Sequence, residues 1–401
     1  IYESLLWVGG KMKLNSDYSS DISSLLNEQR KDTLFISTWD KDEEILPFPS
    51  KKIAMYGKIE SDQASKYFFS DELFDLKKYI LSENGEFLES HIAASNFTFV
   101  SNGTIAAWLS LLTIQKEIEQ IKVLLLSPIY YIYVEMLRQL KADIYYESAC
   151  NADFTKIYST IISNKINLVI INNPLFGTGI CIPNEIINTI QAALLKTNGC
   201  ILIDNIYNGL KWEQTASLND FELYNKVSCY HNFIILESLA KNLFLNGIKH
   251  CSIFSSSEWI DKIEKNSVLF FGSITAQQYN YIQKLYSQNE RSFIMQQLTQ
   301  NIDYAQNNYY LLFSMLTNKK IYVSNCVSGI YCLFGIPRSK FNSQNDLSIA
   351  KEILIKSNVL TLPHDRYLYT DQKNYCFRIN LMAKRETLYK SISALQNCFD
   401  I

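Results

Sequence analysis

The sequence predicts an α/β fold with two domains: a large one built on a mostly parallel sheet between helices, and a smaller one of the α+β type. The chain has 401 residues, more than a single compact core usually accommodates. From about residue 98, strands that are apolar throughout alternate with helices, which is typical of a parallel sheet covered on both faces. After about residue 285 this alternation stops and one long helix begins.

The expected elements of the large domain lie between residues 98 and 285. The hydrophobic pattern predicts helices at 105–114, 130–140 and 183–196, and strands at 121–127, 165–172, 200–204, 232–237 and 250–255. Ligands of such sheets bind at the carboxyl ends of the strands. Polar residues follow several of these ends, so we look for the functional site there.

The expected elements after residue 285 form the smaller domain. They are a long helix at 286–316, strands at 320–325, 329–335 and 375–382, and helices at 345–357 and 385–398. The first 50 residues are polar and irregular and end in a proline-containing turn. We expect residues 1–50 to join the small domain, residues 51–285 to form the large, ligand-binding domain and residues 286–401 to form the small one.

Composition excludes several classes of protein. The net charge is -2, which is not the basic excess of a nucleic-acid-binding or membrane-surface protein. No apolar run approaches the roughly 20 residues that span a bilayer. Nine scattered cysteines without CxxC spacing are typical of a reduced, cytoplasmic protein. Only four histidines are present and none is spaced as a ligand pair, so no metal site is expected.

Lys241 directly follows the strand expected at 232–237, in the segment Ser238-Leu239-Ala240-Lys241. A lysine at such a sheet edge lies in a cleft, where desolvation lowers its pKa and makes its amine nucleophilic. For one isolated lysine, a solvated loop is the ordinary alternative. The interpretation therefore depends on the residues that accompany Lys241.

Asp204 ends the strand expected at 200–204, and Tyr207 follows three residues later. A carboxylate at a strand end can pair with a cationic ring nitrogen and keep it protonated. A phenol three residues later can reach the same ring. The alternative for Asp204 is that it caps the following segment, a common role for aspartate.

Three further sites carry candidate binding residues. The segment Asn102-Gly103-Thr104 precedes a helix, and free N–H groups, the helix dipole and a hydroxyl together form a phosphate cradle, although ordinary helices also start this way. Tyr130 follows the strand at 121–127 and could stack on a ring, or simply pack. Arg378 lies in an apolar strand and needs an anionic partner, which is either a substrate carboxylate or a structural ion pair.

Taken in order along the chain, these residues resemble the class I/II aminotransferases, which are pyridoxal 5'-phosphate enzymes of fold type I. The resemblance runs from about Tyr67 to Arg378, most of the chain. It implies a seven-stranded sheet in the large domain and a cofactor held as a Schiff base on Lys241. It also implies that Asp204 contacts the pyridine nitrogen and Tyr207 the ring hydroxyl.

The remaining roles also come from this resemblance. Asn173, in Asn172-Asn173-Pro174, would contact the ring hydroxyl oxygen and the substrate, and Arg378 would bind the substrate α-carboxylate. Tyr130 would stack on the pyridine ring. Tyr67 would reach the phosphate of a neighbouring subunit, which implies a homodimer. The residues that would surround the phosphate within one chain are Asn102, Gly103, Thr104, Ser238 and Lys249.

The chain departs from the family pattern at four places. Lys249 stands where the family has an arginine, and a lysine supplies charge without a planar fork. The segment 175–179 makes the Asn-Pro loop longer than usual. The turn expected to contain glycine near 36–40 reads Ser37-Thr38-Trp39-Asp40, and His364 follows Pro363. The last three departures put the substrate pocket, and therefore the type of reaction, in question.

The sequence thus predicts a cytoplasmic aminotransferase of amino acid metabolism that moves an amino group from an amino acid to a 2-oxo acid, with no nucleic-acid or membrane partner. One alternative is another pyridoxal-phosphate enzyme, such as a cyclase, oxidase, lyase or decarboxylase of a specialised biosynthesis. A second alternative is a regulatory module that keeps the fold without catalysis, although no basic helix-turn-helix segment is visible. A serine hydrolase and a nucleotide-binding dehydrogenase are disfavoured, because the G-x-S-x-G and G-x-G-x-x-G motifs are absent.

Overall fold

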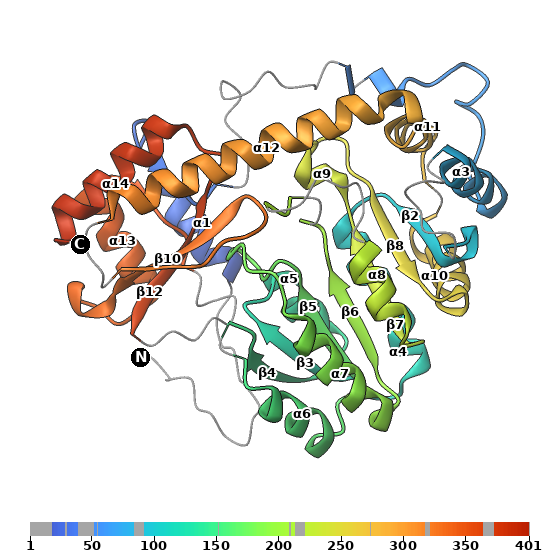
Figure 1. Cartoon of the computed structure of the whole chain (residues 1–401), viewed down its shortest axis with the longest axis horizontal. Helices are drawn as coiled ribbons and strands as arrows, with labels where there is room; N and C mark the ends of the chain where they lie inside the picture. Colours follow the sequence, from blue (N-terminus) through green and yellow to red (C-terminus); the bar gives the residue numbers. More distant parts are fainter. Residues whose placement is uncertain are drawn as a thin grey trace.

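The computed structural model has the predicted α/β fold, with a seven-stranded sheet between helices and a separate, smaller sheet (Figure 1). The structure describes residues 18–28, 30–38, 52–53, 55–83, 92–150, 152–207, 210–212, 221–272, 274–316, 321–363 and 373–400. Trp39, Asp40 and His364, which the sequence singled out as departures, lie outside these ranges.

The central sheet has the strand order β2-β8-β7-β6-β5-β3-β4. Its strands are β2 (Phe97–Val100), β3 (Lys122–Ser127), β4 (Asp143–Ser148), β5 (Leu168–Asn172), β6 (Cys200–Asp204), β7 (Phe233–Glu237) and β8 (Cys251–Ser255). Strand β8 is antiparallel to both of its neighbours, and the other paired strands of this sheet are parallel. The carboxyl ends of β5, β6 and β7 consequently meet at one edge.

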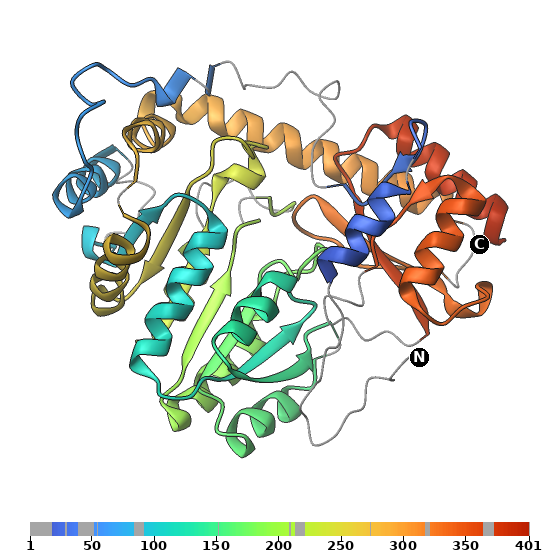
Figure 2. The same ribbon diagram turned by 180° about the vertical axis from the view of Figure 1, so that it is seen from behind.

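Helices cover both faces of this sheet because alternate strand residues point to opposite sides. On β3, Val123 and Leu125 belong to one buried cluster, and Leu124 and Leu126 belong to the other. The helices of the first cluster are α4 (Gly103–Glu117), α5 (Tyr131–Gln139) and α10 (Ser257–Phe271); those of the second are α6 (Phe154–Ser163), α7 (Asn184–Thr197) and α8 (Phe221–Ser228). Figure 1 shows α6, α7 and α8 in front of the sheet, and Figure 2 shows α4, in cyan, on the opposite face.

The long helix α12 (Gln288–Met315) follows α11 (Ala276–Leu285) and runs from the central sheet to the small one (Figure 1). The small sheet is antiparallel, with the order β12-β10-β9, and two helices follow its strands. These elements are β9 (Tyr322–Val323), β10 (Tyr331–Pro337), β12 (Asn374–Asn380), α13 (Asp346–Ser357) and α14 (Arg385–Phe399). The domain boundaries that we placed near residues 50 and 285 stay a prediction.

The N-terminal segment packs beside the small sheet. Strand β1 (Leu34–Phe35) pairs in parallel with β11 (Val359–Leu360), and α1 (Tyr18–Asn27) contacts α13. The remaining elements are the helices α3 (Ser70–Glu83) and α9 (Leu239–Asn242) and the single 3-10 turns η1 (Met55–Gly57), η2 (Ala94–Asn96) and η3 (Arg338–Lys340).

Most of the predicted strands and helices are present to within a few residues, but several elements were not predicted. Strand β4 begins and ends in polar residues, because it is the edge strand of the sheet, so it lacks the fully apolar pattern of its neighbours. The amphipathic helices α6 and α10 lie on the surface, one on each side of the sheet. The sequence pattern also did not indicate that β8 runs against the other strands.

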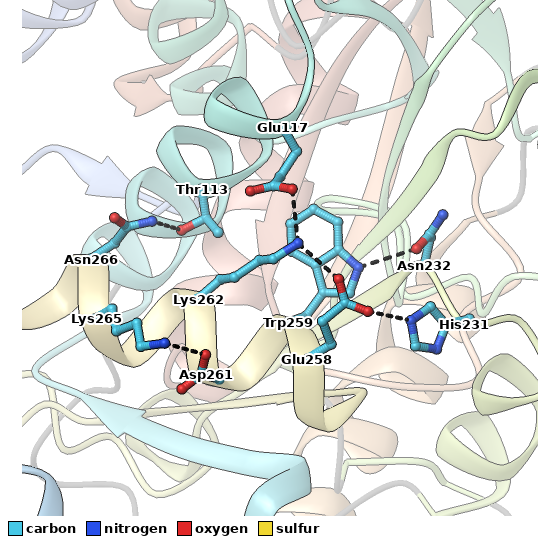
Figure 3. A network of polar contacts seen from close by, with 10 residues as sticks. All are labelled: Thr113, Glu117, His231, Asn232, Glu258, Trp259, Asp261, Lys262, Lys265 and Asn266. Carbon is cyan, nitrogen blue, oxygen red and sulfur yellow. Dashed lines mark hydrogen bonds and ion pairs between the residues drawn. The ribbon is translucent and has the colours of Figure 1, made fainter.

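Helix α10 is fixed against α4 by a set of polar contacts (Figure 3). The Nζ atom of Lys262 donates to Glu117 at 2.8 Å and to Glu258 at 2.9 Å, and these two carboxylates come from different helices. Deeper in the interface, the buried Nδ2 of Asn266 donates to the hydroxyl of Thr113 at 3.0 Å. These contacts hold the helix whose N-terminus was predicted to bind phosphate.

Asn266→Ala should lower the free energy of unfolding by about 1–3 kcal/mol, because it removes a buried hydrogen bond and leaves polar groups of α4 unpaired. Urea denaturation measures this change. Lys265→Ala is the matched control on the same helix. Its ion pair with Asp261 is exposed, so its effect should stay within about 0.5 kcal/mol. Equal losses in the two variants would contradict the structural role of Asn266.

Candidate active site

Asp204 closes β6 as a buried carboxylate that is surrounded by neutral hydrogen-bond donors. The hydroxyl of Tyr133 donates to its Oδ2 at 2.9 Å, the N–H of Ile206 donates to its Oδ1 at 3.3 Å, and Asn172 also hydrogen-bonds to it. Burial raises the pKa of Asp204 to about 6, and these three hydrogen bonds lower it in part. Among the described residues, its partners carry no positive charge, so the site is suited to a cationic group.

Two of these partners, Tyr133 and Asn172, were not assigned a role from the sequence. Tyr133 lies in the first turn of α5 and is fully buried. Asn172 ends β5, and its Oδ1 accepts a hydrogen bond from the N–H of Tyr130 at 2.8 Å, which fixes the start of α5 beside the sheet. The signal for Tyr133 was its position one helical turn after Tyr130, which places both on the side of α5 near the strand ends.

The predicted phosphate-binding turn packs against the loop that follows β6. The Oδ1 of Asn102 caps α4 by accepting from the N–H of Ile105 at 2.9 Å. At Gly103, a Cβ atom would lie 2.5 Å from Cδ1 of Ile206, so the start of α4 packs directly against the side chain that follows Asp204 and Asn205. The side chain of Thr104 is exposed beside it.

Lys241 lies on the short helix α9, directly after β7. Ser238 caps this helix, since its hydroxyl oxygen accepts from the N–H of Ala240 at 3.1 Å. The same hydroxyl donates its proton to the carbonyl of His250 at 2.6 Å. Lys241 is half-buried, and its Nζ donates to Oδ1 of Asn246 at 3.0 Å.

Lys241 and Asp204 follow neighbouring strands of the sheet, β7 and β6, with Asp204 paired to Leu236 in the ladder. The structure thus brings both residues to one edge of the sheet. It records no direct contact between their side chains among the described residues.

Arg378 connects the small sheet to the N-terminal segment and to the loop after β5. Its Nε and Nη2 donate to the carbonyl of Ser37, both at 3.3 Å, and the hydroxyl of Ser37 donates back to the carbonyl of Arg378 at 2.7 Å. The guanidinium carbon lies 4.7 Å from the ring centre of Tyr331 and 5.6 Å from that of Phe176. The buried cation is therefore held over two aromatic faces.

Two of the aromatic residues singled out from the sequence pack against the rings that contact Arg378. The ring of Tyr130 lies 5.2 Å from that of Phe176, and the ring of Tyr207 lies 5.7 Å from that of Tyr331. Burial, with smaller contributions from Tyr331 and Tyr130, raises the pKa of Tyr207 well above its usual range, while Arg378 opposes this rise. The structure therefore brings Tyr130, Tyr207 and Arg378 into one neighbourhood.

The other candidates lie around this neighbourhood. The Nδ2 of Asn173 donates to Asn205 at 3.0 Å, and its Oδ1 accepts from the N–H of Ile182 at 3.0 Å. Lys249 is exposed. Its carbonyl and that of Ser101 both accept from Nε2 of Gln278 at 3.4 Å, which links the segment of Lys249 to the phosphate-binding turn.

Tyr67 has 73% of its surface exposed and stacks on Phe69 at a ring separation of 5.2 Å. The phosphate contacts assigned to Asn102, Gly103, Thr104, Ser238, Lys249 and Tyr67 stay predictions.

No group of three or more His, Cys, Asp or Glu side chains is placed to hold a metal ion within the described ranges. None of the helices in those ranges is long and apolar enough to cross a membrane.

The chain matches the family model described as aminotransferase class I and II over residues 76–395. Similar solved structures include an Escherichia coli protein with a reported methionine aminotransferase function, at 13% identity, 99% coverage of both chains and a TM-score of 0.78. A mutant aspartate aminotransferase of Thermus thermophilus is 15% identical, with 96% of this chain and 97% of that chain covered and a TM-score of 0.79. The Thermotoga maritima aspartate aminotransferase is 14% identical, with 96% of both chains covered and a TM-score of 0.73. No curated protein matches the chain in sequence.

In the ligand-free wild type, ionisation of Asp204 should lower the free energy of unfolding as the pH rises. The variant Asp204→Asn should not show this fall. The pKa of Asp204 is raised from 3.8 to about 6 by folding, so the folded chain binds more protons than the unfolded chain between these values. The stability that protonated Asp204 contributes is present below the unfolded pKa and is lost as the pH rises through the folded one. The variant lacks this loss.

The free energy of unfolding of Asp204→Asn, relative to the wild type, should therefore rise by about 2 kcal/mol between about pH 4 and pH 7. Urea titrations at a series of pH values measure it. Asp261→Asn, at an exposed carboxylate, is the control and should show no such trend. A difference for Asp204→Asn that is independent of pH would contradict the assigned environment.

Proposed function

The chain belongs to the class I and II aminotransferases, and we propose that its own Asp204, Lys241 and Arg378 perform the amino transfer of that family. Enzymes of this family generally depend on pyridoxal 5'-phosphate. The observation that best supports the proposal is the buried carboxylate of Asp204, whose described partners are all neutral. Asp204 ends the strand next to β7, and Lys241 follows β7.

The residues at this edge of the sheet fit the cofactor. A protonated pyridine nitrogen would supply the positive charge that Asp204 lacks among its described partners. Gly103 packs against Ile206, so the N-terminus of the 15-residue helix α4 lies next to the loop after β6, where it could bind the phosphate. This edge of the sheet thus offers an anionic group for the ring nitrogen and a helix N-terminus for the phosphate.

The proposed contacts are those that the resemblance to the family implies. Asp204 would hold the ring nitrogen, Tyr207 and Asn173 the ring hydroxyl oxygen, and Tyr130 the ring face. Lys241 would carry the cofactor covalently through its amine. Asn102, Gly103, Thr104, Ser238 and Lys249 would surround the phosphate, together with Tyr67 of a second copy of the chain.

When bound, the cofactor supplies an electron-withdrawing ring that stabilises the charge left when an amino acid loses its α-proton. Asp204 keeps that ring protonated, because its ionised carboxylate favours a proton on the nitrogen opposite it. The free amine of Lys241 would take up the α-proton as a general base and return it as a general acid.

Arg378 would bind the α-carboxylate of the amino acid and of the 2-oxo acid. The guanidinium is already oriented by Ser37 and by the faces of Tyr331 and Phe176, so little conformational entropy is lost when a carboxylate binds. This arrangement explains the longer loop at 175–179, because that loop brings Phe176 under the cation. Asn173 would take part in substrate binding from the same side.

We also propose that the active enzyme is a homodimer. Tyr67 and Phe69 are exposed, and so are the four apolar residues at the end of α10, namely Val268, Leu269, Phe270 and Phe271. An antiparallel bridge between Phe68 and Ile274 brings the two segments together, and α3 and α10 lie at one end of the molecule (Figures 1 and 2). Exposed apolar side chains on two adjoining segments are typical of a subunit interface.

A cytoplasmic location remains part of the proposal. The structure contains nine free cysteines, five of them buried. Unpaired cysteines in this number are typical of a reducing compartment.

Lys241→Ala should abolish the near-ultraviolet and visible absorbance of covalently bound cofactor and reduce turnover by at least about a thousandfold, because it removes both the attachment point and the general base. Absorbance after incubation with the cofactor, and formation of a new amino acid from an amino acid and a 2-oxo acid, measure these effects. Lys265→Ala, an exposed lysine on α10, serves as the control and should behave as the wild type.

Omission of each substrate separates amino transfer from the other reactions of the same cofactor. Transfer requires an amino donor and an oxo-acid acceptor together. Product formed from the amino acid alone would contradict amino transfer, and full activity in Lys241→Ala would contradict the assigned lysine.

Leu269→Glu should convert a dimer of 46.4 kDa chains into monomers, because it places a charge in the proposed apolar interface. Sedimentation equilibrium measures the mass. Ile355→Glu is the matched control, since Ile355 has 76% of its surface exposed against 73% for Leu269 but lies on α13 at the other end of the molecule. A monomeric wild type, or dissociation in the control alone, would overturn this interface.

A further inference from the structure

Asn173, Asn205 and Glu237 form a row across the carboxyl ends of β5, β6 and β7. The backbone ladder continues past the strands, since the N–H of Asn173 donates to the carbonyl of Asp204, and the N–H of Asn205 donates to that of Leu236, both at 2.8 Å. The three side chains therefore share one face of the sheet, opposite the face of Asp204. All three are buried, with exposed fractions of 7%, 1% and 6%.

The hydrogen bonds along this row all run in one direction. The Nδ2 of Asn173 donates to Oδ1 of Asn205 at 3.0 Å, and the Nδ2 of Asn205 donates to Oε1 of Glu237 at 3.0 Å. An asparagine amide can be turned either way, whereas an ionised carboxylate only accepts. Glu237 therefore determines that Asn205 turns its nitrogen toward β7 and its oxygen toward Asn173.

The other end of the row imposes the same orientation on Asn173. Its Oδ1 accepts from the backbone N–H of Ile182 at 3.0 Å, and one hydrogen of its Nδ2 goes to Asn205. A side-chain amide has two N–H groups. The second N–H of Asn173 is the one that would donate a hydrogen bond to a bound ring.

Burying the polar side chains of this row costs desolvation free energy. Stability alone therefore does not explain why the row is present. Apolar side chains at the same positions would avoid the desolvation of a carboxylate and an amide, and such replacements are often neutral or stabilising. The charge of Glu237 also acts on neighbouring groups, because it contributes to the raised pKa values of Tyr286 and Cys251, for which burial is the largest cause.

We propose that Asn205 and Glu237 are positioning residues that turn the amide of Asn173 so that an N–H group, and not the carbonyl oxygen, faces the oxygen substituent of the bound cofactor ring. This inference rests on the proposed function, from which it takes the ring contact of Asn173. An N–H group stabilises negative charge on that oxygen, whereas a carbonyl oxygen would repel it.

The experiment is a pH titration of the absorbance of the cofactor-loaded dimer. A donor to the ring oxygen stabilises the deprotonated chromophore, so loss of the donor raises the midpoint of the titration. Asn205→Ala should raise this midpoint by about 0.5–1 pH unit, because Asn173 loses the acceptor that orients it. The double variant Asn205→Asp with Glu237→Gln keeps both the acceptor facing Asn173 and the net charge, and its midpoint should stay within about 0.2 pH unit of the wild type.

Ser252→Ala is the control for a purely structural effect. Ser252 lies opposite Glu237 in the β7–β8 register, is also buried and hydrogen-bonds to Tyr286, and it is not one of the three residues of the row. Ser252→Ala should lower the free energy of unfolding and leave the midpoint of the absorbance titration unchanged. A wild-type midpoint in Asn205→Ala, or an equal shift in Ser252→Ala, would overturn the proposal.

A neutron structure of the loaded wild type tests the orientation even if the variants do not fold. Deuterium on the Asn173 atom that faces the ring oxygen supports the proposal, and a bare oxygen there overturns it. A wild type that takes up no cofactor at all would instead refute the proposed function, so the two failures remain distinguishable.

Discussion

The buried carboxylate of Asp204 is the constraint on which the rest of the site depends. A carboxylate at the end of a central strand is expensive to ionise, and in the ligand-free protein burial outweighs the hydrogen bonds from Tyr133, Ile206 and Asn172. Those donors hold the group in place without neutralising it. The fold thus keeps a negative charge available for a cationic ring. The strand β6 that carries Asp204 is paired on both sides, with β5 and β7, and packs between apolar side chains, so the position of the carboxylate is fixed.

Arg378 provides the second fixed charge, and it comes from a different sheet. Its side chain is held by the carbonyl of Ser37, from the N-terminal segment, and by the faces of Tyr331 and Phe176. The surroundings of Arg378 are therefore assembled from three separate parts of the chain, and only one of them, the loop with Phe176, follows a strand of the central sheet. The long helix α12, which runs between the two sheets, is anchored to α9 by Asn301, whose Nδ2 donates to the carbonyl of Asn242 at 2.8 Å.

Much of the large domain was predictable because buried parallel strands have an apolar pattern that no surface element shares. The ends of β5, β6 and β7, and with them Asn173, Asp204 and Lys241, could therefore be placed from the sequence. Partners that act from elsewhere could not. Tyr133 was one of several tyrosines in a row, and Ser37 lies 341 residues from Arg378, so only the folded chain shows that they meet. The direction of β8 could not be predicted either. An antiparallel strand with two buried faces has the same apolar composition as a buried parallel strand.

The strand ends carry two different sets of polar contacts on two faces, and a single register sets both. Asn172 and Asp204 point to one face, where they meet Tyr133; Asn173 and Asn205 point to the other, where they meet Glu237. A shift of one residue in the pairing of β5 with β6 would exchange the faces and break both sets of contacts at once. The consecutive pairs Asn172-Asn173 and Asp204-Asn205 are therefore constrained together, since each residue must be polar for a different reason. This explains why polar pairs interrupt strands that are otherwise apolar to their last residue.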